Sequence, residues 1–182
     1  MSISKEALLE KVRAAFTNVP YPEDTGIVSQ ADLWDSEGRL VLDALIGKHW
    51  TKIEPNIQRP VSKDVDAGGY TVFSHDNTLS FLTPEAFHFY LPAFLIASLD
   101  VPNNGFIIMS VLSSLSPDRF LMPSPVFAQK LALLTEDQRE AIGMFWAYLF
   151  EHHPDEVSGY DLARIAEYWS KPRSSNTSRN VD

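Results

Sequence analysis

Apolar residues recur at intervals of three and four along most of the chain, which predicts a largely helical protein. The central stretch of this kind, residues 83–99, is apolar around most of its helical circumference, so we expect it to be buried on most sides. Thr83 suits the N-cap, Pro84 the first helical position, and Glu85 the positive end of the helix dipole. We predict that this helix forms the centre of the core, with a bend at Pro92, because an internal proline loses its backbone hydrogen bond.

The same helical periodicity recurs on both sides of the central stretch. It predicts helices over residues 4–16, 29–46, 125–134, 135–152 and 158–170. Thr135 is followed three positions later by Gln138, which is the pattern of a capping box and gives the clearest helix start in the chain. Ser29 is the candidate cap of the second helix, which we expect to continue to residue 46. The alternative is a break in this helix at Gly38.

Two stretches have weaker patterns. Residues 106–115 are apolar but too few for their period to separate a helix from a buried strand, and their helical neighbours favour a helix. Residues 47–80 contain two prolines and the pair Gly68-Gly69, which predicts an ordered loop with helical turns near residues 50–58. Within this loop, residues 70–73 have the β-branched and aromatic composition of a short strand.

The predicted fold is an all-α, compact multi-helix domain with orthogonal or bundle-like packing, and it leaves room for one minor β hairpin. We expect residues 1–170 to form a single globular domain, because a chain of 182 residues is long enough to bury one hydrophobic core. Residues 171–182 are polar and have no periodicity, which predicts a flexible tail.

Composition and charge exclude several classes of protein. A net charge of −9 is unsuited to the phosphates of nucleic acids and to anionic membrane surfaces, so we expect neither as a partner. The absence of cysteine excludes disulfides, thiol nucleophiles and thiolate metal sites. No apolar run approaches the ~20 residues of a membrane span, and the charged N-terminus lacks the apolar segment of a signal peptide. We therefore expect a cytoplasmic protein.

Three runs of residues together resemble a known family. They are FLTPEAFHFYLPAFLIASL at residues 81–99, KVRAAFTNVPYP at residues 11–22, and the tryptophan of GKHW, Trp50. At these positions the chain is similar to a family of bacterial proteins known as domain of unknown function 6714. The resemblance covers the first two thirds of the chain. It implies no activity and no catalytic residues, because none is established for the family.

The histidines are the first candidates for catalysis. His88 could act as a general base held by Glu85, which lies three residues earlier on the same face of the central helix, and His75 is a further candidate. The alternative, which we favour, is a core histidine that hydrogen-bonds one carboxylate and one backbone group. The sequence has neither the signature of a nucleophilic serine nor a phosphate-binding glycine loop.

His152 and His153 are the weak candidates for a metal site, together with acidic residues that follow them. Adjacent histidines on a helix point in different directions, so they seldom complete the ligand geometry of one ion. Their position near a helix C-terminus has another explanation, since the helix dipole stabilises a positive charge there. We therefore expect no metal and no cofactor.

These observations favour a non-enzymatic, acidic binding protein, for instance one of immunity or adaptor type that covers a basic protein partner. Tyr21, Trp34 and Trp50 are the candidate binding residues, because large aromatic side chains are enriched at protein interfaces. The alternative is a small hydrolase-type enzyme with an acid–base site near the bend at Pro92. A homodimer formed through one of the apolar helices remains open in both cases.

Overall fold

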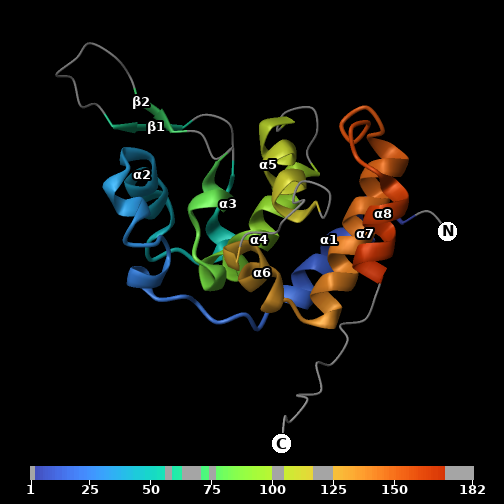
Figure 1. Ribbon diagram of the computed structural model, residues 1–182, viewed down its shortest axis with the longest axis horizontal. Helices are drawn as coiled ribbons and strands as arrows, with labels where there is room; N and C mark the ends of the chain where they lie inside the picture. Colours follow the sequence, from blue (N-terminus) through green and yellow to red (C-terminus); the bar gives the residue numbers. More distant parts are fainter. Residues whose placement is uncertain are drawn as a thin grey trace, which may run out of the picture.

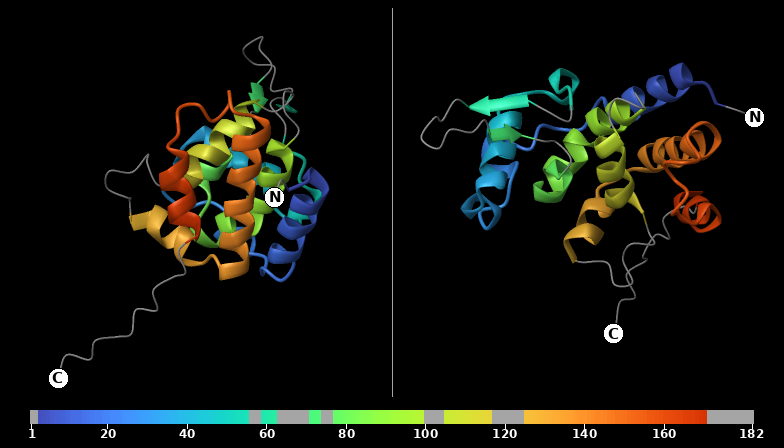
Figure 2. Two further views of the ribbon diagram at one scale, coloured as in Figure 1. Left: turned by 90° about the vertical axis from the view of Figure 1, so that its right-hand side faces the viewer. Right: turned by 90° about the horizontal axis from the view of Figure 1, so that it is seen from above.

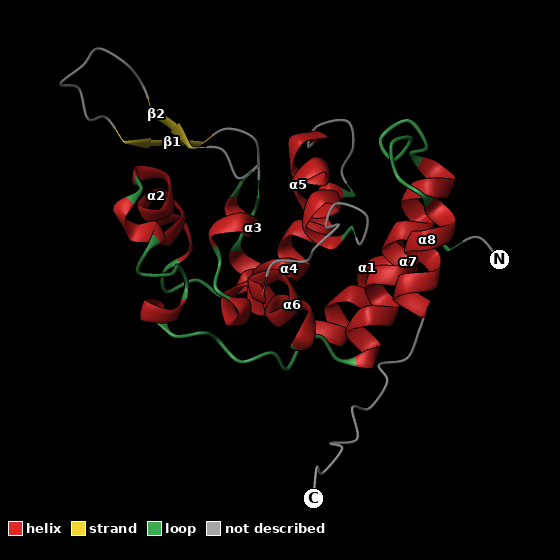
Figure 3. Cartoon of the chain, viewed as in Figure 1, coloured by secondary structure: helices red, strands yellow, loops and turns green. Residues whose placement is uncertain are grey.

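The computed structural model describes residues 3–55, 59–62, 71–73, 77–99, 105–116 and 125–170. Its helices are α1 Lys5–Phe16, α2 Ser36–Leu45, α3 Thr78–Phe81, α4 Pro84–Ser98, α5 Gly105–Leu115, α6 Pro125–Ala132, α7 Glu136–His152 and α8 Leu162–Ser170. The shorter elements are the 3-10 turns η1 Asp24–Gly26, η2 Asp32–Trp34 and η3 Trp50–Lys52, and the strands β1 Arg59–Ser62 and β2 Thr71–Phe73. The predicted all-α class is confirmed, as Figure 3 shows.

Helix α4 lies at the centre of the molecule, as the sequence predicts (Figure 1). It packs against α1, α5 and α6, and ten of its 15 residues are buried. The Thr83 hydroxyl accepts from the Ala86 N–H at 3.2 Å and donates to the Gly26 carbonyl, so the cap also attaches α4 to the chain before α2. The helix continues through Pro92, which is itself buried.

Helices α7 and α8 pack against each other, and α7 also packs against α1 (Figure 2). The predicted capping box is confirmed. The Thr135 hydroxyl accepts from the Gln138 N–H at 3.3 Å, and the Gln138 side-chain oxygen accepts from the Thr135 N–H at 2.9 Å. Helix α8 contributes Ile165 and Trp169 to the core.

The prediction of one helix over residues 29–46 is wrong. The Ser29 hydroxyl does accept from the Asp32 N–H, at 3.2 Å, but the turn that follows is only η2. The backbone becomes extended at Asp35 (φ −82°, ψ 138°), and α2 begins after this residue, which is its cap. Gly38 is therefore not a break. A Cβ built on Gly38 would lie 2.2 Å from the Asp32 carbonyl oxygen, so the close approach of η2 to α2 requires glycine.

The other predicted helices are present with small changes at their ends. Residues 106–115 are helical, as α5, and the helix predicted over residues 125–134 is the slightly shorter α6. Helix α8 begins later than the predicted start at Ser158, because the Asp161 carboxylate accepts from the Arg164 N–H and caps the helix there. None of the described helices has both the length and the apolar character needed to cross a membrane.

In its described part, the loop predicted over residues 47–80 contains the helical turn η3 and the start of the short helix α3, which the sequence pattern did not reveal. Strand β2 falls within residues 70–73, as predicted, and pairs antiparallel with β1. The pair Gly68-Gly69 and the tail over residues 171–182 lie outside the described residues.

Candidate functional site

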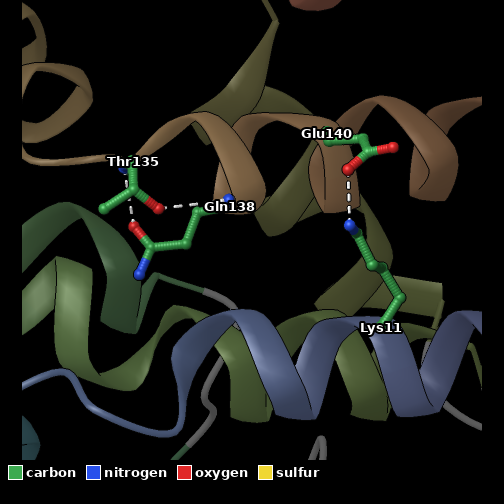
Figure 4. A network of polar contacts seen from close by, with 4 residues as sticks. All are labelled: Lys11, Thr135, Gln138 and Glu140. Carbon is green, nitrogen blue, oxygen red and sulfur yellow. Dashed lines mark hydrogen bonds and ion pairs between the residues drawn. The ribbon is translucent and has the colours of Figure 1, made fainter.

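His88, the first catalytic candidate, lies where α1, α4 and α7 meet. Its Nε2 is 2.7 Å from the side-chain oxygen of Gln138, and the Gln138 amide nitrogen donates to the Ala15 carbonyl at 3.1 Å. The orientation of this amide is fixed, because the Thr135 N–H can only donate and the Ala15 carbonyl can only accept. Gln138 Oε1 is therefore an acceptor, and His88 Nε2 must carry the proton. Figure 4 shows Gln138 beside Thr135 in this network.

The surroundings of His88 support a packing role. Burial lowers the pKa of His88, while the hydrogen bond to Gln138 opposes this shift in part. The imidazole also packs edge-on against Phe16, with 6.2 Å between ring centroids. Glu85 is exposed, and within the described part of the chain no hydrogen bond joins it to His88. His75 lies outside the described residues.

His152 and His153 end helix α7, and both pack against Tyr148. The Tyr148 ring centroid is 4.4 Å from that of His152 and 5.9 Å from that of His153. The His153 N–H donates to the Leu149 carbonyl at 2.7 Å. In the residues that the structure describes, no group of three or more possible ligands is placed to hold a metal ion. The contacts of the two histidines are those of a helix end.

Two of the three aromatic binding candidates have structural roles. Trp50 is buried in the core at 4% exposure. Tyr21 is half-buried, and its hydroxyl donates to the Asp24 carboxylate at 2.5 Å and accepts from the Gly47 N–H at 2.8 Å. Its ring packs edge-on against Phe89 of α4 at 5.3 Å. Tyr21 therefore connects the segments on both sides of α2 to the central helix.

Trp34, the third candidate, is 88% exposed at the end of η2. Three carboxylates flank it in the chain: Asp32, Asp35 and Glu37. We call these four residues the Trp34 surface. The Asp32 carboxylate accepts from the Ser29 hydroxyl at 2.7 Å, and the Asp35 carboxylate accepts from the Glu37 N–H at 2.9 Å. Local hydrogen bonds thus fix two of the three carboxylates that neighbour the exposed Trp34 in the chain.

Lys130 of α6 is a buried cation that the sequence analysis did not single out. It is only 7% exposed, and its ammonium group donates to the carbonyls of Leu79 at 2.9 Å and Ser80 at 3.4 Å, near the end of α3. The ammonium nitrogen also lies 5.2 Å from the centroid of the Phe87 ring. Burial lowers the pKa of Lys130 to about 8, although the charge of Asp32 opposes the shift. The sequence signal was weak, since a lysine in the last turn of a short helix is ordinary.

Arg139 of α7 is a second buried cation, and its partner is likewise a carbonyl near the end of another helix, α8. Its guanidinium donates to the Tyr168 carbonyl at 3.0 Å and lies 5.4 Å and 5.1 Å from the rings of Tyr168 and Trp169. A cation at this position is favoured by the negative end of the α8 dipole. Lys130 and Arg139 therefore join helices, and neither is placed as a reactive group.

Comparisons with known proteins give one match. The model of a family of unknown function, DUF6714, matches residues 4–173, which extends well beyond the three runs that first indicated the resemblance. No curated protein and no solved structure is significantly similar to the chain. The match brings no known ligand or reaction to the Trp34 surface or to His88.

Proposed function

The chain belongs to the DUF6714 family of unknown function, and we propose that it is a non-enzymatic binding protein that covers a basic protein partner, as immunity and adaptor proteins do. The observation that supports this proposal is the exposure of Trp34. The other three tryptophans, Trp50, Trp146 and Trp169, are 4%, 1% and 3% exposed, whereas Trp34 is 88% exposed. Tryptophan is among the residues that contribute most binding energy at protein interfaces.

The charge around Trp34 indicates what kind of partner would fit. Carboxylates flank Trp34 in the chain, and the whole chain carries a net charge of −9. A lysine or arginine side chain of a partner can lie over the face of an indole and pair with a neighbouring carboxylate in the same contact. The same charge opposes the approach of a second copy of this chain. A basic protein segment is therefore the partner that we propose.

The alternative enzyme has less support. Its acid–base site requires Glu85 to hold the His88 imidazole, but Glu85 is exposed and, in the described residues, the hydrogen-bond partner of the His88 side chain is Gln138. A cytoplasmic location is part of the proposal, because a chain without cysteine needs no oxidising compartment for its stability.

The experiment compares tagged full-length protein, Trp34→Ala and Leu162→Ala as baits in a lysate of the cells that produce the protein, at low and at high salt. Leu162 is an exposed apolar residue of α8 and serves as the matched control. We expect the wild type and Leu162→Ala to retain the same basic protein in stoichiometric amount at low salt, and Trp34→Ala to retain at least about tenfold less. High salt should release the partner from all baits.

Trp34→Ala is expected to change the free energy of unfolding by less than about 0.5 kcal/mol, since the ring is exposed, so a loss of capture reports on the surface itself. Equal capture by Trp34→Ala and the wild type would overturn the proposal. Capture of an acidic protein, or capture that high salt does not weaken, would contradict it as well.

A further inference from the structure

Helices α7 and α8 lie at the end of the molecule opposite α2 (Figures 1 and 2). Their side chains border a groove of about 490 Å³. Its apolar part consists of Gly143, Met144, Ala147, Ala166 and Trp169, and Glu140 lies on its border. The volume falls within the range of about 300–1,000 Å³ that is typical of small-molecule sites. The groove is separate from the Trp34 surface, so an inference about it does not rest on the function proposed above.

Gly143 is the residue whose identity needs an explanation. It lies in the interior of α7, the 17-residue helix, where glycine is a poorer helix former than any other residue except proline. Its backbone does not require glycine, since its φ is not positive. A Cβ built on it would meet only the Cβ of Trp169 within 4 Å, at an ordinary contact distance of 3.5 Å. Neither conformation nor packing therefore requires glycine, and its absent side chain leaves the groove open.

The charges at the groove favour a cation. The Glu140 side chain is 59% exposed, and Lys11 of α1 contacts one of its two carboxylate oxygens, as Figure 4 shows. Two more carboxylates, those of Glu136 and Asp137, lie in the first turn of α7, and Glu136 also borders the groove. Among the described cations near the groove, Lys11 occupies one oxygen of Glu140, and Arg139 is buried and directed to the Tyr168 carbonyl, where the α8 dipole offsets its charge.

We propose that the α7–α8 groove binds a small organic cation, an aryl or alkyl group that carries an ammonium. The apolar group would lie against Met144, Ala147 and Trp169 in the space that Gly143 leaves. The ammonium would pair with the carboxylate oxygen of Glu140 that Lys11 does not contact. A second copy of the chain is a poor occupant, because both copies carry a net charge of −9.

The test titrates ¹⁵N-labelled full-length protein with three probes that share a phenyl ring and a two-carbon linker: phenethylammonium, 2-phenylethanol and 3-phenylpropionate. The signals to follow are the Gly143 amide and the Trp169 indole N–H. We expect saturable shifts of both with phenethylammonium, an affinity at least about threefold lower for the alcohol, and one at least about tenfold lower for the carboxylate. Absence of saturable shifts, or equal affinity for ammonium and carboxylate, would overturn the proposal.

Variants assign the binding to the groove. Gly143→Leu should weaken phenethylammonium binding at least about tenfold, because the new side chain occupies the apolar part. Gly143→Ala should weaken phenethylammonium binding less than Gly143→Leu does, because its side chain is smaller. Since alanine should also raise the melting temperature, a loss of binding by this variant cannot be due to unfolding. Glu140→Gln should reduce the affinity for the ammonium to that for the alcohol. If Gly143→Ala and Glu140→Gln both bind phenethylammonium as the wild type does, the site is not this groove.

Discussion

At the scale of single residues, the buried amide of Gln138 connects three helices. Its oxygen accepts from the Thr135 N–H and from His88, and its nitrogen donates to the Ala15 carbonyl. Gln138→Ala removes all three hydrogen bonds and leaves polar partners in the interior, so we expect a loss of about 2–4 kcal/mol in the free energy of unfolding. Urea denaturation measures this difference.

Thr135→Ala is the matched control for this prediction, because it removes only the cap of α7. We expect it to lose about 1 kcal/mol. If Gln138→Ala is no more destabilising than Thr135→Ala, the hydrogen bonds to His88 and Ala15 contribute nothing to stability.

Lys130 gives a prediction for the pH dependence of stability. Its pKa in the folded protein is about 8, below the ordinary value of 10.5 that we assume for the unfolded chain. Between these two values the unfolded chain binds more protons than the folded one, so stability rises with pH. Relative to Lys130→Met, the wild type should gain about 2 kcal/mol in the free energy of unfolding between pH 7 and pH 9.5. The measurement is urea denaturation of both proteins across this range. Parallel pH profiles of the two proteins would refute the prediction.

At the scale of elements, the sequence shows where helices begin better than it shows what they pack against. Thr83 and Thr135 are caps that depend on residues within one turn, so local pattern suffices to find them. The error over residues 29–46 arose because Ser29 makes a cap-like hydrogen bond in a turn that does not continue as a helix. Lys130 and His88 have partners about 50 residues away in the chain, and no local pattern reveals such a contact. Local pattern is equally insufficient to find the candidate site. Of three aromatic residues that look equivalent in the sequence, only the fold shows that Trp34 is exposed.

Two glycines within helices should respond to alanine in opposite ways. Gly38→Ala places a Cβ against the Asp32 carbonyl, so we expect it to lower the free energy of unfolding by about 1–3 kcal/mol although alanine is the better helix former. Gly143→Ala meets no such obstacle and should raise it by up to about 1 kcal/mol. Urea denaturation of both variants tests the pair. Stabilisation by Gly38→Ala would mean that η2 does not approach α2 as closely as described.

At the scale of the whole molecule, the central helix α4 separates the two surfaces to which we assign binding. Helix α2 lies at one end of the molecule and α7 and α8 at the other (Figure 1). Turn η2, which carries Trp34, packs against α2, and α7 and α8 border the groove. Substitutions at sites that are far apart and share no partner usually have additive effects, within about 0.5 kcal/mol. The two surfaces should therefore act independently unless one partner spans both.

A double-variant experiment tests this independence. Trp34→Ala should reduce capture of the basic partner at least about tenfold and leave the affinity for phenethylammonium unchanged. Gly143→Leu should weaken phenethylammonium binding at least about tenfold and leave capture of the partner unchanged. The double variant should show both losses, each of the size measured in the single variant. If Gly143→Leu also prevents capture of the partner while its melting temperature stays near that of the wild type, independence fails. The cation that the groove accepts would then belong to the same basic partner that contacts Trp34.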